Sequence, residues 1–144
     1  ITIRSIHNSI RENVNEIGDG VQGCFAIKFN KNKDSIDRKN IRKGMVLIDS
    51  IEKWKKNIVR KFTAKITILQ HSTTIRNGYK PLLHCGPIRQ AAKIKLNKEE
   101  ILRIGDSCIV QFTFAFHPEF LEKNMIFFFR DGNTKGVGEV ISLD

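Results

Sequence analysis

The sequence predicts an all-β protein built from antiparallel β-barrels: the closing part of one barrel in residues 1–50 and a complete six-stranded barrel in residues 61–144. Apolar and polar residues alternate in "FTAKITIL" (62–69), "AKIKL" (92–96) and "CIVQFTFAF" (108–116), as is typical of half-buried strands. Turn dipeptides such as Asn-Gly, Gly-Pro and Asp-Gly separate these runs. Many short strands in so few residues favour a closed barrel, which has no exposed edge.

The second barrel is expected to contain six strands. They are predicted at residues 61–71, 79–85, 88–96, 107–116, 124–130 and 134–142. Alternation places Phe62, Ile66, Val110, Phe112 and Phe114 in its core. Phe116 continues the same alternation and is expected to point inward as well.

Two short segments of this half look helical. Residues 97–102, "NKEEIL", have Asn97 in a capping position. Residues 117–123, "HPEFLEK", place Pro118 at the first helical position, where its missing N–H is no disadvantage. We expect one helical turn in each.

The first fifty residues have a different organisation. Strands are predicted at residues 1–7, 20–29 and 42–48, and so few strands rarely make a stable domain alone. We interpret them as the closing part of a second barrel. Since the chain begins with Ile1 and not Met, we expect it to be part of a longer protein.

Residues 51–60 are expected to link the two barrels. The segment "KWKKNIVRK" (53–61) combines five basic residues with Trp54, the only tryptophan. One interpretation is a solvated linker whose tryptophan anchors a domain interface. The other is a basic, aromatic contact for a phosphate backbone. The first is favoured, because aromatic residues commonly anchor interfaces.

The net charge restricts the partners that the chain can have. It carries 25 basic and 15 acidic residues, a formal charge of +10, and residues 51–144 hold 16 of the basic and 9 of the acidic ones. Such a balance favours association with polyanions. A solvated, lysine-rich surface that reflects composition alone is an equally good interpretation. No apolar run of 18 or more residues is present, so no membrane partner is expected.

The three cysteines do not suggest a disulfide framework. Cys24, Cys85 and Cys108 are odd in number and widely spaced, which fits a reducing compartment, and a cytoplasmic location is expected. No CxxC or HxxxH pair supports a metal site.

The adjacent pair His84 and Cys85 is the one arrangement that suggests a catalytic dyad. Neighbouring residues in a strand point to opposite faces of the sheet, so their side chains diverge. A nucleophile and its base need to lie within hydrogen-bond reach. Cys85 is therefore expected to be a buried core residue, and no catalytic residues are predicted.

The glycine-rich stretches do not form a nucleotide site. "GDGVQG" and "RDGNTKGVG" lack the GxxxxGK[ST] pattern of a phosphate-binding loop. We therefore expect that this chain is not an enzyme, holds no cofactor and neither binds nor hydrolyses GTP.

Four motifs, in order, resemble the end of a translational GTPase of the elongation factor Tu and elongation factor 1-alpha class. "GDGVQGCFAIKF…IRKGMVLID" is similar to the closing strands of the second domain in this class, and "GYKPLLHC" to its "GYxPxxxC" motif. "LRIGDSCIV" and "FFFRDGNTKGVGEV" are similar to two later strands of its third domain. Within the class, "HSTTIRNGY" and "HCGPIRQAAKI" look most like the GTP-binding protein 1 and 2 branch.

The resemblance implies a fold and a set of partners. The chain would hold the end of domain II and all of domain III, downstream of a GTPase domain that uses GTP and magnesium. The third domain of this class contacts the T-stem backbone of aminoacyl-tRNA. The implied partners are therefore aminoacyl-tRNA or other structured RNA, the ribosome and the parent's own GTPase domain.

The RNA-binding candidates lie on or beside the turns that match the family's T-stem contacts. They are Arg76, Tyr79, Lys80, His84, Arg89, Arg130, Gly132 and Lys135. Basic side chains can neutralise phosphates, and glycine lets a backbone amide approach one closely. Two other hypotheses remain open: a barrel that docks a translation or mRNA-decay protein without RNA, and a barrel whose charge is compositional.

Overall fold

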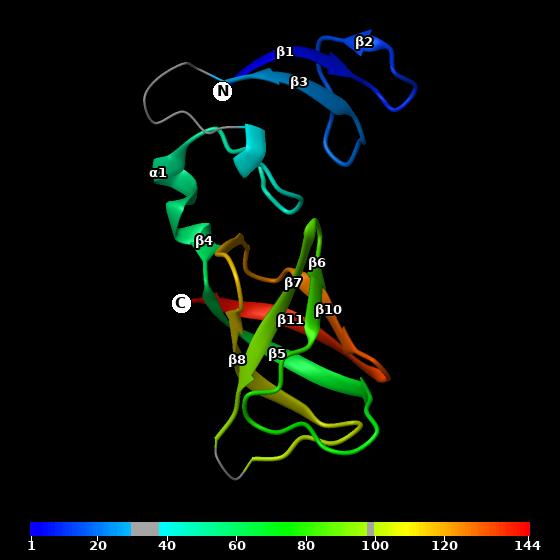
Figure 1. The fold of residues 1–144 in the computed structure, drawn as a ribbon, viewed down its shortest axis with the longest axis vertical. Coiled ribbons are helices and arrows are strands. Elements are labelled where there is room, and N and C mark those ends of the chain that lie inside the picture. Colours follow the sequence, from blue (N-terminus) through cyan, green and yellow to red (C-terminus); the bar gives the residue numbers. More distant parts are fainter. Residues whose placement is uncertain (30–37, 98–99) are drawn as a thin grey trace. The chain divides into compact units, whose positions relative to one another are not determined.

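A computed structural model describes residues 1–29, 38–97 and 100–144 of the chain (Figure 1). The described residues form two compact units, Ile1–Arg42 and Lys43–Asp144. Each unit is described separately below.

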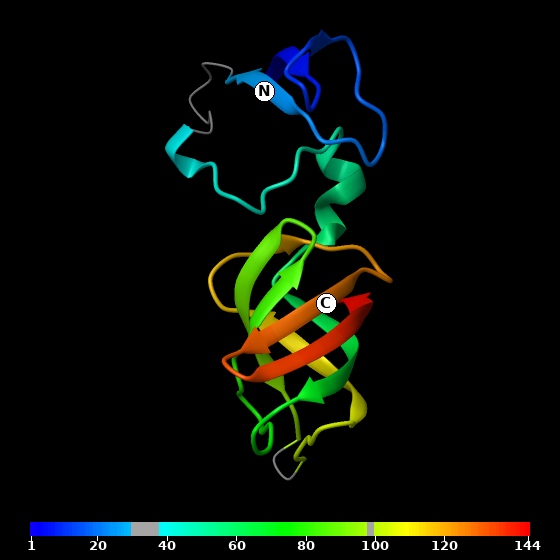
Figure 2. The ribbon, with the colours of Figure 1, turned by 90° about the vertical axis from the view of Figure 1, so that its right-hand side faces the viewer.

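The second unit contains a closed antiparallel barrel, as predicted. Its strands are β5 (Lys61–Gln70), β6 (Leu82–Cys85), β7 (Ile88–Lys95), β8 (Ser107–Phe114), β10 (Ile126–Asp131) and β11 (Thr134–Leu143). They close in the order β10-β11-β5-β8-β7-β6, so that β6 and β10 are hydrogen-bonded neighbours. Figure 2 shows the last two strands, β10 and β11, crossing the near side of the barrel as an antiparallel pair.

Turn chemistry decides where these strands begin and end. β6 begins at Leu82, three residues later than predicted, after the buried Pro81, which has no N–H to donate to a ladder. The hairpin turns after β6 and β10 contain Gly86 at φ 51° and Gly132 at φ 54°. These positive φ angles favour glycine because it has no Cβ.

The core is a cluster of phenylalanine rings. Phe62 stacks on Phe112, with ring centroids 5.2 Å apart, and Phe127 packs edge-on against both rings. All five predicted core residues are buried: Phe62, Ile66, Val110, Phe112 and Phe114. On β11, Gly136 and Gly138 leave the space that the rings of Phe129 and Phe127 occupy. Large and small residues therefore interdigitate across the β10–β11 pair.

The inward position of Phe116 was predicted wrongly, and so was the helical turn at residues 117–123. β8 ends at Phe114, and the chain then bends, which leaves Phe116 68% exposed. Glu119–Phe120 form a short strand, β9, that pairs with β4 (Ile58–Val59). The pattern missed this strand because its partner lies far away in sequence.

The side chain of Gln90 fixes the bend after β8. Its Oε1 accepts hydrogen bonds from the backbone amides of Phe116 (2.6 Å) and His117 (2.8 Å). Its Nε2 donates to the buried carboxylate of Glu119 (2.6 Å). Nε2 also donates to the His117 carbonyl oxygen (3.2 Å), so this one buried amide satisfies four polar groups of residues 116–119.

Replacing Gln90 with methionine is expected to destabilise the barrel by about 2 kcal/mol, because polar groups are left without partners in or near the core. Urea unfolding would measure the loss. Gln111→Met is the matched control, since Gln111 lies half-buried on the outer face of β8 and donates to the exposed Asp144. Equal effects of the two changes would contradict the role given to Gln90.

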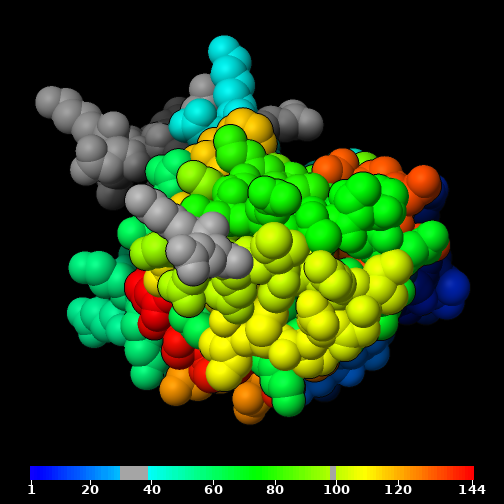
Figure 3. Space-filling view, turned by 90° about the horizontal axis from the view of Figure 1, so that it is seen from below, coloured from blue at the N-terminus to red at the C-terminus, as the bar shows by residue number. Residues whose placement is uncertain are grey.

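The other helical turn was expected at residues 97–102, of which 98 and 99 lie outside the described residues. The described remainder is not helical: Leu102 is buried and forms a β-bridge with Ile75. This bridge joins the loop before β6 to the loop before β8. The two loops cover this end of the barrel with adjacent green and yellow atoms in Figure 3.

The segment predicted to be a linker is structured. It contains α1 (Ile51–Trp54), a 3-10 turn at Lys55–Asn57 (η2) and β4. Trp54 Nε1 donates to Asp49 (2.6 Å), and the indole packs against Phe120 with centroids 5.6 Å apart. Trp54 therefore anchors this segment to β9 within the second unit.

The first unit is an open three-stranded sheet. β1 (Thr2–His7) lies between β2 (Asn13–Val14) and β3 (Cys24–Lys28), and a 3-10 turn, η1, follows at Arg38–Asn40. β1 and β3 were predicted. The strand expected at residues 42–48 is not formed: a turn at Gly44 (φ 95°) interrupts it.

Candidate nucleic-acid interface

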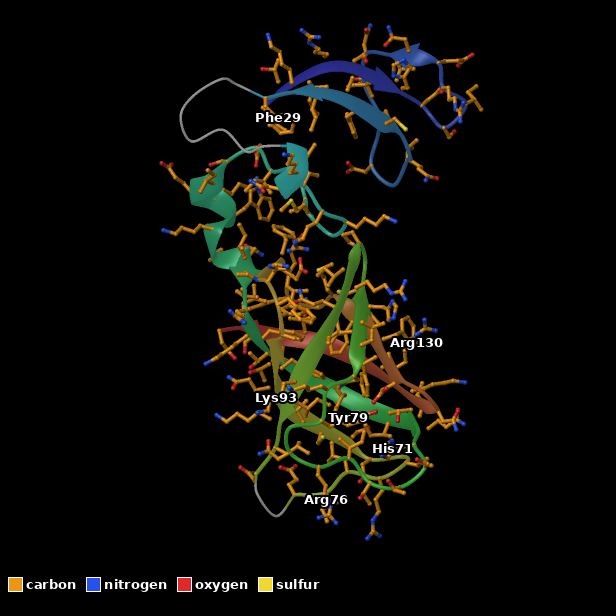
Figure 4. All side chains as sticks on the ribbon, in the orientation of Figure 1. Phe29, His71, Arg76, Tyr79, Lys93 and Arg130 are labelled. Atoms are coloured by element: carbon orange, nitrogen blue, oxygen red, sulfur yellow. The ribbon has the colours of Figure 1, made fainter. Side chains whose placement is uncertain are left out.

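Two loops meet at one end of the barrel, where several candidate residues lie. Residues 71–81 connect β5 to β6, and the β10–β11 turn ends at Thr134. His71 Nδ1 lies 2.6 Å from the Thr134 hydroxyl, and the His71 and Tyr79 rings meet edge to face at 5.7 Å. Figure 4 shows His71 and Tyr79 beside each other. The contacts hold the loop against the turn.

Tyr79 packs against His71 where the loop of residues 71–81 meets the β10–β11 turn. Burial, and then the carboxylate of Asp131, raise the pKa of its phenol, and a hydrogen bond with Thr134 opposes them. The raised pKa keeps the phenol protonated near neutral pH. The ring contact with His71 orients Tyr79 within the loop.

Four of the candidate residues share the outer face of neighbouring strands. His84 on β6 lies directly opposite Arg89 on β7. Arg130 on β10 lies opposite Leu82, two residues from His84, and Lys135 on β11 lies opposite Arg130. Strands β7, β6, β10 and β11 thus carry a row of basic groups on neighbouring strands, although up to 51 residues, from His84 to Lys135, separate them in sequence.

His84 is the least satisfied member of this row. The residue is half-buried, and its Nε2 is shielded from solvent and has no hydrogen-bond partner in the described structure. Burial, then Arg130 and then Arg89, lower the pKa of the imidazole. The free protein therefore holds His84 neutral between two cations.

Cys85 points the other way, as predicted from the strand geometry. It is buried, its Sγ faces the Ile126 carbonyl oxygen at 3.6 Å, and burial raises the pKa of its thiol. A buried thiol of raised pKa is a poor nucleophile. The structure thus agrees with the interpretation of Cys85 as a core residue.

The loop residues Arg76 and Lys80 are exposed. Figure 4 shows Arg76 at the tip of the loop and Arg130 on β10, so the structure does not bring these two together. Lys93 could not be singled out from the sequence pattern. Its Cε lies 3.4 Å from where a Cβ on Gly78 would stand, and Gly78 has φ 88°, so the lysine stem packs along the loop. Only the register of β7 against this loop reveals that contact.

Gly132 is open to approach from outside. A Cβ at this position would meet nothing within 4 Å, and the residue is exposed at the tip of the β10–β11 turn. Its backbone amide is therefore accessible to an anion.

Among the described residues, no group of three or more His, Cys, Asp or Glu side chains could hold a metal ion. No helix in this part of the chain is long and apolar enough to cross a membrane.

Comparison with known proteins identifies the barrel. The family described as "Elongation factor Tu C-terminal domain" matches residues 55–144, which include all six barrel strands. The chain belongs to this family. The resemblance deduced from the motifs is confirmed.

Relatives of this elongation factor Tu C-terminal domain chain include larger GTP-binding proteins. GTP-binding protein 1 of Xenopus laevis is 38% identical over 143 residues, which cover 99% of this chain and 20% of that protein. GTP-binding protein 2 of Homo sapiens is 39% identical over 105 residues, or 72% of this chain and 17% of that protein. Elongation factor 1-alpha of Cenarchaeum symbiosum (strain A) is 32% identical over 94 residues, or 56% of this chain and 21% of that protein. The chain thus spans about a fifth of the length of these relatives.

Proposed function

We propose that this translation-factor-like barrel contacts the phosphate backbone of structured RNA, with aminoacyl-tRNA as the first candidate, as part of a GTPase that also meets the ribosome. The observation that carries the proposal is the row of His84, Arg89, Arg130 and Lys135 across four neighbouring strands. Basic groups in a row can follow successive phosphates without reading bases. The loop cations Arg76 and Lys80 and the open Gly132 extend the same proposal to the end of the barrel.

The parent protein supplies the rest of this function. We propose that GTP and magnesium bind upstream of this region and that the parent works in the cytoplasm. The chain itself has no GxxxxGK[ST] sequence, so it lacks the amide cradle and lysine that a triphosphate needs. Its proposed contribution is binding and not catalysis.

Replacing Arg76, Arg89, Arg130 and Lys135 together by alanine is expected to flatten the salt dependence of RNA binding. Each phosphate contact contributes roughly 0.7–0.9 to the slope of log affinity against log salt, so four lost contacts lower it by about 3. Filter binding of an RNA stem at several salt concentrations measures the slope.

The matched control removes four cations from the segment before the barrel. All four are exposed lysines, and their replacement by alanine changes the net charge by the same amount as the first variant. They are Lys53, Lys55, Lys56 and Lys61. This variant is expected to keep most of the slope. If it loses the slope while the first variant keeps it, the RNA contacts lie in the segment around Trp54.

Protein docking is a second candidate, because two large apolar side chains are exposed on the outer face of β10. Phe128 is 60% exposed and Ile126 is 55% exposed. Exposed apolar patches commonly mark interaction sites. Binding of a translation or mRNA-decay protein that survives high salt and is lost in Phe128→Ala would favour this candidate over RNA.

A further inference from the structure

Three groups that can carry positive charge converge on one point of the outer barrel face. His84 lies opposite Arg89 on one side and Phe128 on the other, and Arg130 lies two residues from Phe128. Directly opposite residues have Cβ atoms about 5 Å apart and diagonal ones about 7–8 Å apart, within reach of arginine. A single small ligand can therefore touch all three side chains.

These groups lack partners in the described part of the chain. His84 Nε2 is shielded from solvent without a hydrogen bond. Arg89 and Arg130 are exposed, and none of the described acidic residues forms an ion pair with them. A shielded polar atom beside two unpaired cations is costly unless a ligand completes the arrangement.

We propose that His84, Arg89 and Arg130 form a subsite for one RNA phosphate and that binding of this phosphate protonates His84. This inference rests on the proposed RNA-binding function. A phosphate offers oxygens that match the fork of arginine and accept a hydrogen bond from imidazolium. Its negative charge also offsets the burial and the repulsion from Arg130 and Arg89 that keep the imidazole neutral.

The surrounding charges leave His84 as the group that responds to pH. The two strands beside β6 contribute Arg89 from β7 and Arg130 with Asp131 from β10, and Asp131 interacts with Tyr79. On β11, one strand further away, Lys135 and Glu139 point outward. Arginine stays charged throughout the neutral range, and a phosphodiester stays anionic.

The sign of the pH effect follows from linkage. Burial and the two arginines lower the pKa of His84 in the free chain, whereas a bound phosphate raises it. Binding therefore takes up a proton between the two values, and RNA affinity rises as pH falls. One proton permits at most a tenfold change for each pH unit.

The test measures the affinity of an RNA stem for the chain between about pH 7.5 and pH 5.5 at constant ionic strength, the range in which histidine titrates. The unchanged chain is expected to bind about three- to tenfold more tightly at the acidic end. The RNA affinity of the His84→Gln variant is expected not to change with pH over this range. Ile109→Ala, a control at an exposed position on β8, two strands away from β6, is expected to keep the pH dependence.

NMR of the histidine ring protons of the unchanged chain gives a readout that needs no variant. The midpoint of His84 is expected to rise when RNA is added. Tight RNA binding with no pH dependence and no shift of His84 would overturn the subsite and leave the proposed function intact. Absence of RNA binding at every pH would overturn both.

Two further arms separate other ligands. Inorganic phosphate that shifts His84 when RNA does not would overturn the assignment to RNA. An acidic peptide that shifts the titration midpoint of His84 but does not compete with RNA would assign this face to a protein partner. That result would overturn the proposal as well.

Discussion

Replacing Phe112 with alanine is expected to destabilise the barrel by about 3–5 kcal/mol, the range for a buried phenylalanine whose space cannot collapse. Phe112 is fully buried and packs against Phe62, Phe127 and Phe129, with ring centroids 5.2, 5.4 and 6.2 Å away. Rings from two strands, β5 and β10, surround the cavity that the change leaves, so no single side chain can fill it. Urea unfolding followed by Trp54 fluorescence measures the loss, because Trp54 packs against β9 of the same unit.

Phe128→Ala is the matched control for this prediction. It removes the same side chain from an outward position on β10, where Phe128 is 60% exposed. The cost is expected to stay within about 0.5 kcal/mol, as for most surface changes. Equal losses for the two variants would show that the ring cluster is not the main source of stability.

Replacing Gly136 with valine is expected to cost at least about 3 kcal/mol, because the core has no space for added atoms. A Cβ at Gly136 would overlap the ring of Phe129, which is itself buried against Phe112. The ring cannot move outward without opening the β10–β11 pair. Alanine at the same position is expected to cost less, about 2 kcal/mol.

Thermal unfolding of both Gly136 variants measures this effect, and Val137→Thr is the control. Val137 lies beside Gly136 on β11 but faces outward and is half-buried. Its change is expected to lower Tm by only a few degrees, whereas each 1 kcal/mol lowers Tm of a unit of this size by roughly 4–8 °C. A Gly136→Val chain as stable as the control would refute the tight fit between β10 and β11.

Alternation predicted the barrel well because the outer and inner faces of its strands differ in polarity. All six strands lie within a few residues of the predicted positions, and Cys85 faces the core as expected. The exceptions depend on distant partners. β9 forms because it pairs with β4 and because Gln90 donates a hydrogen bond to the Glu119 carboxylate. Neither partner lies within the segment "HPEFLEK".

The candidate interface was predictable in its residue types but not in its arrangement. The motifs selected His84, Arg89 and Arg130, yet only the register shows that they share one face. The strand register also places the side chain of Lys93 beside Gly78 in the loop before β6. It also separates Arg76 from Arg130, although both were candidates for the same contact.

The closed order of the strands has a consequence for synthesis on the ribosome. β6 needs β10 as one of its two neighbours, and β10 needs β11, the last strand in sequence. A nascent chain that has exposed His84 and Arg89 therefore still lacks Arg130 and Lys135, which emerge later. The row of basic groups is complete only when β11 has been synthesised, so a barrel still being made cannot compete with finished molecules for the proposed RNA ligand.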